Sequence, residues 1–192
     1  MAQTQQAAEK NGIITWKIDP AHSNAQFSVR HLMISNVKGE FTRVSGQVLL
    51  DPSKPESLSA EATIDVSTIN TREPDRDTHL KSPDFFDVAK YPTLTFKSKG
   101  AVAGPDGLKI TGDLTIHGTT REVTLEVDGP TPPLKDPWGN TRIGASASTK
   151  INRKDFGLVW NQALETGGVL VGDEIRINLD VELVAESVGA NN

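Results

Sequence analysis

The sequence predicts an all-β domain, an antiparallel barrel or sandwich of about eight or nine strands with two short helical segments. Apolar and polar residues alternate over many short segments, and Gly, Pro, Asn and Asp separate these segments at regular intervals. Helical character is confined to two short segments, neither long enough to cover a parallel sheet. The chain has 192 residues, a length that suits one domain of this class.

The strands can be placed in order from their period of two. The last is the clearest, because five apolar residues from Ile175 to Leu183 alternate with polar or charged ones. Residues 108–127 predict a hairpin, since two alternating runs flank the tight connection His117–Thr120. The full set of expected strands is 13–18, 25–31, 38–50, 60–66, 93–103, 108–116, 122–127, 141–152 and 175–183. The two helical segments are 74–81 and 158–166.

Barrel and sandwich differ in how much internal space they leave. The two inner faces of a sandwich must fill one another with bulky side chains. Several inward positions are small here, namely Ala60, Ala62, Gly112, Ala145 and Ala147. An eight-stranded barrel lined partly by such residues leaves room for one ligand. The alternative is that large residues on facing strands fill the space.

Composition sets the limits on partners. The net charge is −5 with a pI near 5.4, so neither nucleic acid nor an anionic membrane surface is an expected main partner. There are no cysteines, which excludes disulfides and thiolate metal sites. No apolar run is long enough for a membrane helix.

We expect a cytoplasmic protein as the sequence is written, or a periplasmic one if a signal peptide has been removed. The expected boundaries are 1–12 for an N-terminal tail, 13–185 for the barrel and 186–192 for a C-terminal tail.

The sequence offers no convincing catalytic or metal constellation. Four histidines are present, but none are spaced as HxH or HxxxH, which favours separate structural roles. A triad of Ser23, His22 and Asp77 can be drawn, yet no nucleophile elbow supports it. No phosphate-binding or dinucleotide glycine pattern occurs. We therefore expect no catalytic residue, no metal and no cofactor.

Two charged segments allow both a structural and a functional interpretation. The segment 71–81 is dense in charge and predicts either a solvated helix at the barrel mouth or a lid that meets a polar head group. Phe85 and Phe86 follow, and such a pair either plugs a barrel end or touches an entering lipid. In 152–158, Arg153 and Asp155 are placed to form a local ion pair, and Gly157 permits a positive φ.

Six segments resemble the YceI-like family of polyisoprenoid-binding proteins. They are WKIDPAHSNAQFSVRH (16–31), LMISNVKGEF (32–41), TREPDRDTHLKSPDFF (71–86), KYPTLTF (90–96), GDLTIHGTT (112–120) and INRKDFG (151–157). They follow the family order from about residue 14 to residue 185. The resemblance implies a lipocalin-like extended barrel with a small helical cap. It also implies a tunnel for a polyisoprenoid chain, such as a polyprenyl phosphate or a quinone tail, and a homodimer.

Combining the resemblance with the alternation gives a set of candidate ligand-binding residues. The expected lining is Phe27, Val29, Phe41, Ala62, Ile64, Leu94, Phe96, Leu114, Ala145 and Ala147. The expected mouth is His31, Arg76, His79, Tyr91 and Arg153.

Three functions remain open from the sequence. The first is a non-catalytic carrier of an isoprenoid lipid. The second is an enzyme acting on such a lipid, with His31 or His79 as general base. The third is a stress-protection domain whose barrel is filled by side chains.

Overall fold

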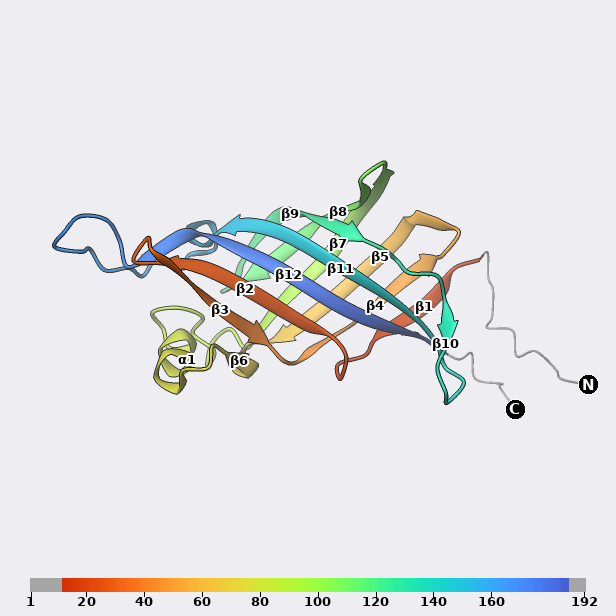
Figure 1. Ribbon diagram of the computed structural model, residues 1–192, viewed down its shortest axis with the longest axis horizontal. Coiled ribbons are helices and arrows are strands. Elements are labelled where there is room, and N and C mark those ends of the chain that lie inside the picture. Colours follow the sequence, from red (N-terminus) through yellow and green to blue (C-terminus); the bar gives the residue numbers. More distant parts are fainter. Residues whose placement is uncertain (1–11, 187–192) are drawn as a thin grey trace, which may run out of the picture.

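The computed structural model describes residues 12–186, which form a closed antiparallel barrel extended at one end by three further strands (Figure 1). Most of the two expected tails, residues 1–11 and 187–192, lies outside the described residues. The strands are β1 (Ile14–Ile18), β2 (Asn24–His31), β3 (Ser35–Phe41), β4 (Val44–Asp51), β5 (Lys54–Asp65), β6 (Ile69–Asn70), β7 (Thr93–Gly104), β8 (Gly107–Ile116), β9 (Thr119–Asp128), β10 (Leu134–Lys135), β11 (Thr141–Asn152) and β12 (Val171–Ala185). The helices are η1 (Val66–Thr68), α1 (Pro74–Lys81) and η2 (Arg153–Phe156).

The barrel closes through β12, the longest strand. Along one edge β12 pairs with β11, and along the other it pairs first with β2 and then with β1. The closed ring runs β11-β9-β8-β7-β5-β4-β1-β12, with eight strands. Strands β2, β3 and β6 continue the sheet from the N-terminal half of β12. The prediction of an all-β barrel with about eight strands and a short helical cap is therefore confirmed.

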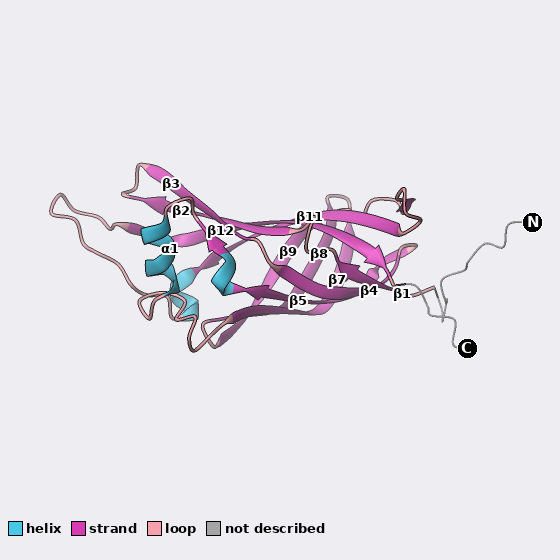
Figure 2. Cartoon of the chain, turned by 90° about the horizontal axis from the view of Figure 1, so that it is seen from below, coloured by secondary structure: helices cyan, strands magenta, loops and turns pink. Residues whose placement is uncertain are grey.

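The helix α1 spans Pro74–Lys81, as the sequence predicts, and lies beside β6 (Figure 1), at one end of the molecule (Figure 2). Proline at its first position suits a helix start, because proline has no N–H to satisfy there. The hydroxyl and the amide of Thr71 both donate to the Asp77 carboxylate, at 2.6 and 2.8 Å. Arg76 donates to the Thr71 hydroxyl and carbonyl. These bonds fix the helix against the strand that precedes it.

The expected single strand at 38–50 is wrong, because the structure has two strands there. β3 ends at Phe41 and pairs with β2, whereas β4 begins at Val44 and pairs with β5 and β1. Phe41 and Val44 are both buried although they are three residues apart. A continuous strand would place these two side chains on opposite faces, so the break at residues 42 and 43 carries the chain from one pairing to the next.

The expected helix at 158–166 is also wrong. This segment forms a loop with one isolated bridge between Ala163 and Val169. The carbonyls of Leu158 and Trp160 accept hydrogen bonds from the Arg153 guanidinium at 2.6 and 2.8 Å. They are therefore engaged outside the i→i+4 pattern that a helix requires.

Candidate functional site

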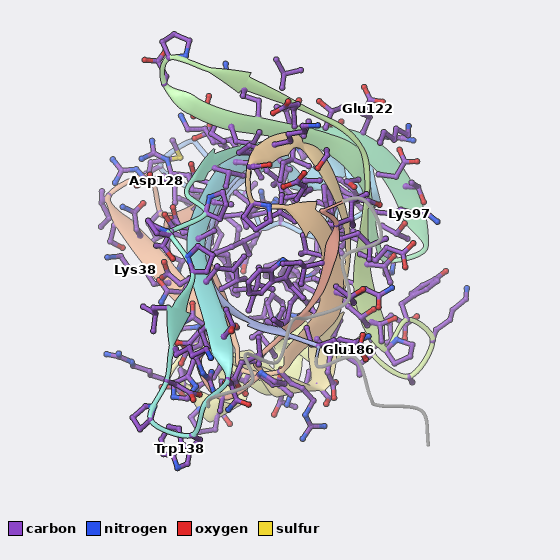
Figure 3. All side chains as sticks on the ribbon, turned by 90° about the vertical axis from the view of Figure 1, so that its right-hand side faces the viewer. Lys38, Lys97, Glu122, Asp128, Trp138 and Glu186 are labelled. Atoms are coloured by element: carbon purple, nitrogen blue, oxygen red, sulfur yellow. The ribbon has the colours of Figure 1, made fainter. Side chains whose placement is uncertain are left out.

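The barrel encloses an apolar cavity of about 270 Å³. Figure 3 looks along the barrel and shows side chains from the surrounding strands pointing into its interior. On β12 the wall includes residues from Val171 to Leu183, which at about 3.3 Å per residue extends over about 40 Å of strand. The cavity is therefore long and narrow, a shape that suits an extended chain better than a compact ligand.

Alanines keep the interior open. In the eight-stranded ring, β5 lies four strands from β11 in either direction, so the two face each other across the barrel. Ala60 and Ala62 on β5, and Ala145 and Ala147 on β11, all line the cavity. Small residues on opposing walls leave a gap that bulky pairs would fill. The sequence expectation that these alanines mark internal space agrees with the structure.

Gly112, the fifth small residue, has a different role from the one expected. A Cβ at this position would lie 2.5 Å from the Phe96 ring and 2.5 Å from the Lys97 carbonyl oxygen. The missing side chain therefore makes room for an aromatic ring of the wall rather than for a ligand. Gly39 makes room for the Phe27 ring in the same way, because a Cβ at residue 39 would lie 2.5 Å from that ring.

Aromatic residues close the end of the cavity that carries α1. Leu80, Phe85 and Phe86 contribute to the wall there, and Phe86 meets Phe41 edge to face with ring centroids 5.8 Å apart. Outside them, Trp160 packs on Phe85 at 5.2 Å and on His79 at 4.8 Å. This cluster joins the cap around α1 to the loop 157–170. The interpretation of Phe85 and Phe86 as residues at a barrel end agrees with their position.

Arg153 is the charged side chain of the wall, and no other charged side chain lines the cavity within residues 12–186. The side chain is 3% exposed. Its Nε donates to the Gly172 carbonyl at 2.8 Å, in addition to the bonds to Leu158 and Trp160, and its Nη2 lies 3.4 Å from Asp173. Burial lowers the pKa of Arg153 from its ordinary value, and the Asp173 carboxylate opposes this. The expected local ion pair with Asp155 is replaced by these longer-range contacts.

The structure places the predicted lining residues on the cavity wall. Those that line it are Phe27, Val29, Phe41, Ala62, Ile64, Leu94, Phe96, Leu114, Ala145 and Ala147. Of the expected mouth residues, only Arg153 lines the cavity within the described part of the chain. Contact of any of these side chains with a ligand stays a prediction.

The other four expected mouth residues lie outside the wall. His31 ends β2 opposite Val171, and Arg76 is bound to Thr71. His79 forms a 2.8 Å hydrogen bond with Asp84, and the Tyr91 ring packs on His117 at 4.6 Å. None of the histidines within residues 12–186 lines the cavity.

The sequence analysis missed part of the wall. Leu80 and Leu158 come from the cap and the loop after η2. Irregular segments carry no periodicity from which an inward direction follows. By contrast Leu58, Ile110 and Leu125 lie on strands, and the alternation already visible there would have found them.

A polar cluster lies outside the barrel. Ligand atoms of Asp19, His22 and Glu182 lie within 4.8 Å of one another, a spacing that would suit a metal ion. Arg142 donates to both carboxylates and to Asp136, so a cation already occupies the position between them. The hydrogen bond from Arg142 lowers the pKa of Asp19 to about 2. The cluster is an ion-pair network that ties β11 to β12 and to the end of β1.

The suggested triad is not assembled. Asp77 is bound to Thr71, whereas His22 pairs with Asp19 at 3.0 Å. The Ser23 hydroxyl exchanges hydrogen bonds with the backbone of Glu182.

Comparison with known proteins gives the same fold. A UPF0312 protein of Staphylococcus aureus is 39% identical over 165 residues, which cover 85% of this chain and 94% of the relative. The YCEI protein of Campylobacter jejuni is 33% identical, with a TM-score of 0.68 over 82% of this chain and 90% of that one. A polyisoprenoid binding domain from Saccharophagus degradans shares the fold at 16% identity, with a TM-score of 0.65 over 90% and 99% of the two chains.

The YceI-like domain matches residues 16–183, nearly the whole of the described barrel. This range includes every segment on which the resemblance rested. The chain belongs to the YceI-like family.

Proposed function

We propose that the protein is a non-catalytic carrier that holds one long-chain isoprenoid lipid in the barrel cavity. The observation that carries the proposal is the cavity itself, which is apolar, narrow and about as long as the barrel. Its wall requires no fixed pattern of hydrogen-bond partners in the ligand. The solved relative from Saccharophagus degradans, which has the same fold, is described as a polyisoprenoid binding domain.

The energetics favour a prenyl chain. Each buried methylene contributes about 0.8 kcal/mol, so one five-carbon isoprene unit contributes up to about 4 kcal/mol before the cost of ordering the chain. Several units in line give a strong driving force without any polar contact. We propose a polyprenyl phosphate or an isoprenoid quinone as the ligand, with its head group toward the end where Arg153 lies. Within residues 12–186, Arg153 carries the only charge that lines the cavity.

The two alternatives have less support. An enzyme that uses His31 or His79 as its base needs one of them beside the ligand, and neither lines the cavity. A filled barrel would leave no internal space, whereas the alanines on β5 and β11 leave an open interior.

The test is to extract bound lipid from the purified protein, identify it by mass spectrometry, and titrate the delipidated protein with a polyprenyl phosphate and an isoprenoid quinone. Ala62→Trp should block uptake, because an indole adds about 150–250 Å² of surface in the middle of a narrow cavity. Thr63→Trp is the matched control, since Thr63 is the next residue of β5 and is exposed on the outer face of the strand. Normal uptake by a folded Ala62→Trp variant, or no uptake by the parent protein, would refute the proposal.

A further inference from the structure

One end of the barrel exposes a group of apolar side chains that no other part of residues 12–186 covers. On the β2–β3 turn, Met33 and Ile34 are 56% and 78% exposed. On the loop 157–170, Val159 and Val169 are 63% and 38% exposed. The amide of Leu32 donates to the Leu170 carbonyl at 2.9 Å, which holds the two segments together. We name these four exposed residues the apolar tip; both segments lie at the left of Figure 1.

The turn that presents the tip is strained. Leu32 and Met33 have φ values of 51° and 61°. His31 pairs with Ser35, so the connection has three residues, and Leu32 and Met33 are the central residues of the β-turn closed by the hydrogen bond from the Ile34 amide to the His31 carbonyl. A turn with positive φ at both central positions favours Gly, Asn and Asp, because larger side chains are disfavoured in that region. The chain instead holds two large apolar residues there and leaves Met33 in solvent. Local strain of this kind points to a function of the side chains.

A row of basic residues lies just behind the tip, on the outer face of the four neighbouring strands β11, β12, β2 and β3. The register places Lys150, Arg176, Ser28 and Lys38 in one row across β11, β12, β2 and β3. Arg30 lies one step closer to the tip. We name Arg30, Lys38, Lys150 and Arg176 the basic belt. Glu174, which approaches Arg176 and Lys150, offsets one of these charges.

The charge reverses farther from the tip. Two rows beyond the belt, Asp128, Ser146 and Asp180 lie side by side across β9, β11 and β12. The row between carries Glu126 and Glu40. On β11, β12, β2 and β3 the outer face is thus positive in the row of Lys38 and negative in the two rows beyond it, within a chain whose net charge is −5. Glu165 on the loop 157–170 and Asp173 on β12 are acidic side chains at the tip end, so the attraction to a negative surface comes from the basic row of this face and not from the whole end of the barrel.

The tip also lies where the cavity ends. Val171 pairs with His31, next to the turn, and both Val171 and Val29 line the cavity. Leu158, the neighbour of Val159, lines it as well. A lipid that leaves the cavity at this end emerges beside the apolar tip.

From these observations we infer that this end of the barrel docks onto an anionic lipid bilayer. Met33 and Ile34 enter the boundary between head groups and acyl chains, and the basic belt contacts lipid phosphates. The spacing fits: Lys38 lies four residues from Ile34, about 13 Å along the strand, and long basic side chains extend toward the surface. Interfacial apolar groups insert about 5–10 Å. The purpose of this docking, exchange of lipid with the membrane, rests on the proposed function.

Co-sedimentation with vesicles tests the inference without any prenyl lipid. We expect the protein to bind vesicles of phosphatidylcholine mixed with phosphatidylglycerol at least about tenfold more tightly than pure phosphatidylcholine, with binding weakened by salt. Met33→Asn combined with Ile34→Ser should lose this binding about tenfold or more without lowering Tm, because asparagine tolerates positive φ. Lys38→Glu with Arg176→Glu should lose the preference for anionic vesicles.

Two controls make the test specific. Val102 is 70% exposed on the β7–β8 hairpin, so Val102→Asn should bind vesicles like the parent protein. Trp138 is 80% exposed on a turn remote from the tip and points away from the barrel in Figure 3. Loss of binding in Trp138→Ala together with normal binding in the Met33→Asn, Ile34→Ser variant would overturn the inference. So would a parent protein that takes up prenyl lipid but ignores anionic vesicles. Vesicle binding without prenyl uptake would instead refute the carrier proposal alone.

Discussion

Replacing Arg153 by methionine should release the loop 157–170 from the barrel. The guanidinium donates strong hydrogen bonds to the carbonyls of Leu158, Trp160 and Gly172, at 2.6, 2.8 and 2.8 Å. A hydrogen bond from a charged donor contributes about 1.5–3 kcal/mol, while the penalty for burying the charge disappears with the side chain. If each of the three hydrogen bonds contributes about 1 kcal/mol net, the substitution lowers the free energy of unfolding by about 3 kcal/mol.

Such a loss corresponds to a fall in Tm of about 6–12 °C for a protein of this size. Thermal unfolding followed by circular dichroism measures the global effect, and amide hydrogen exchange locates it. Exchange should accelerate most at Leu170 and Val171, whose amides bond to Gln162 and to the Asn161 side chain within the same loop. Arg153→Lys keeps the charge but cannot donate to three carbonyls in a fork, so it should recover less than half of the loss.

A change in Tm below about 2 °C for Arg153→Met, with unchanged exchange in the loop, would refute this reasoning. It would show that Asn161 and the packing of Trp160 hold the loop by themselves. A large fall in Tm with unchanged loop exchange would also contradict it, because the damage would then lie elsewhere.

Two further predictions concern stability. Gly112→Ala should destabilise the barrel by about 1–3 kcal/mol in urea unfolding, because the new Cβ collides with the Phe96 ring; Gly100→Ala, where nothing lies within 4 Å, should show no such loss. The second prediction concerns acid. The hydrogen bond from Arg142 holds the pKa of Asp19 at about 2, below the ordinary 3.8. Its contribution is therefore present above about pH 4 and lost as the pH falls toward 2. Arg142→Met should flatten the dependence of Tm on pH in that window, and an unchanged acid profile would count against the network.

The strands could be predicted because the preference of each side chain for the interior or for solvent depends on that residue alone. One face of each strand packs inward and the other meets solvent, so the period of two is present in the sequence itself. The hairpin 108–127 follows this pattern, and His117 and Gly118 both take positive φ between its strands. The helix Pro74–Lys81 was likewise marked by proline at its start.

The errors arose where distant residues decide the conformation. Nothing within 158–166 reveals that the Arg153 guanidinium engages the carbonyls of that segment. The break between Phe41 and Val44 depends on which strand each half pairs with. For the same reason the cavity walls on strands could be predicted, whereas Leu80 of the cap and Leu158 of the following loop could not.

The facing alanines imply that the open cavity costs stability, and this can be measured. Ala60→Leu on β5 and Ala147→Leu on β11 each add three carbons to an apolar cavity. At about 0.8 kcal/mol per carbon, the pair gains up to about 5 kcal/mol, and side-chain ordering reduces this to a few kcal/mol. We expect the double variant to unfold at a higher temperature and to lose uptake of prenyl lipid. Binding sites are often less stable than a filled core would be, because they keep open space that closer packing would fill. A double variant that is less stable than the parent would show instead that the alanines are needed for close packing of the walls, and that the cavity is not a reserve of space for a ligand.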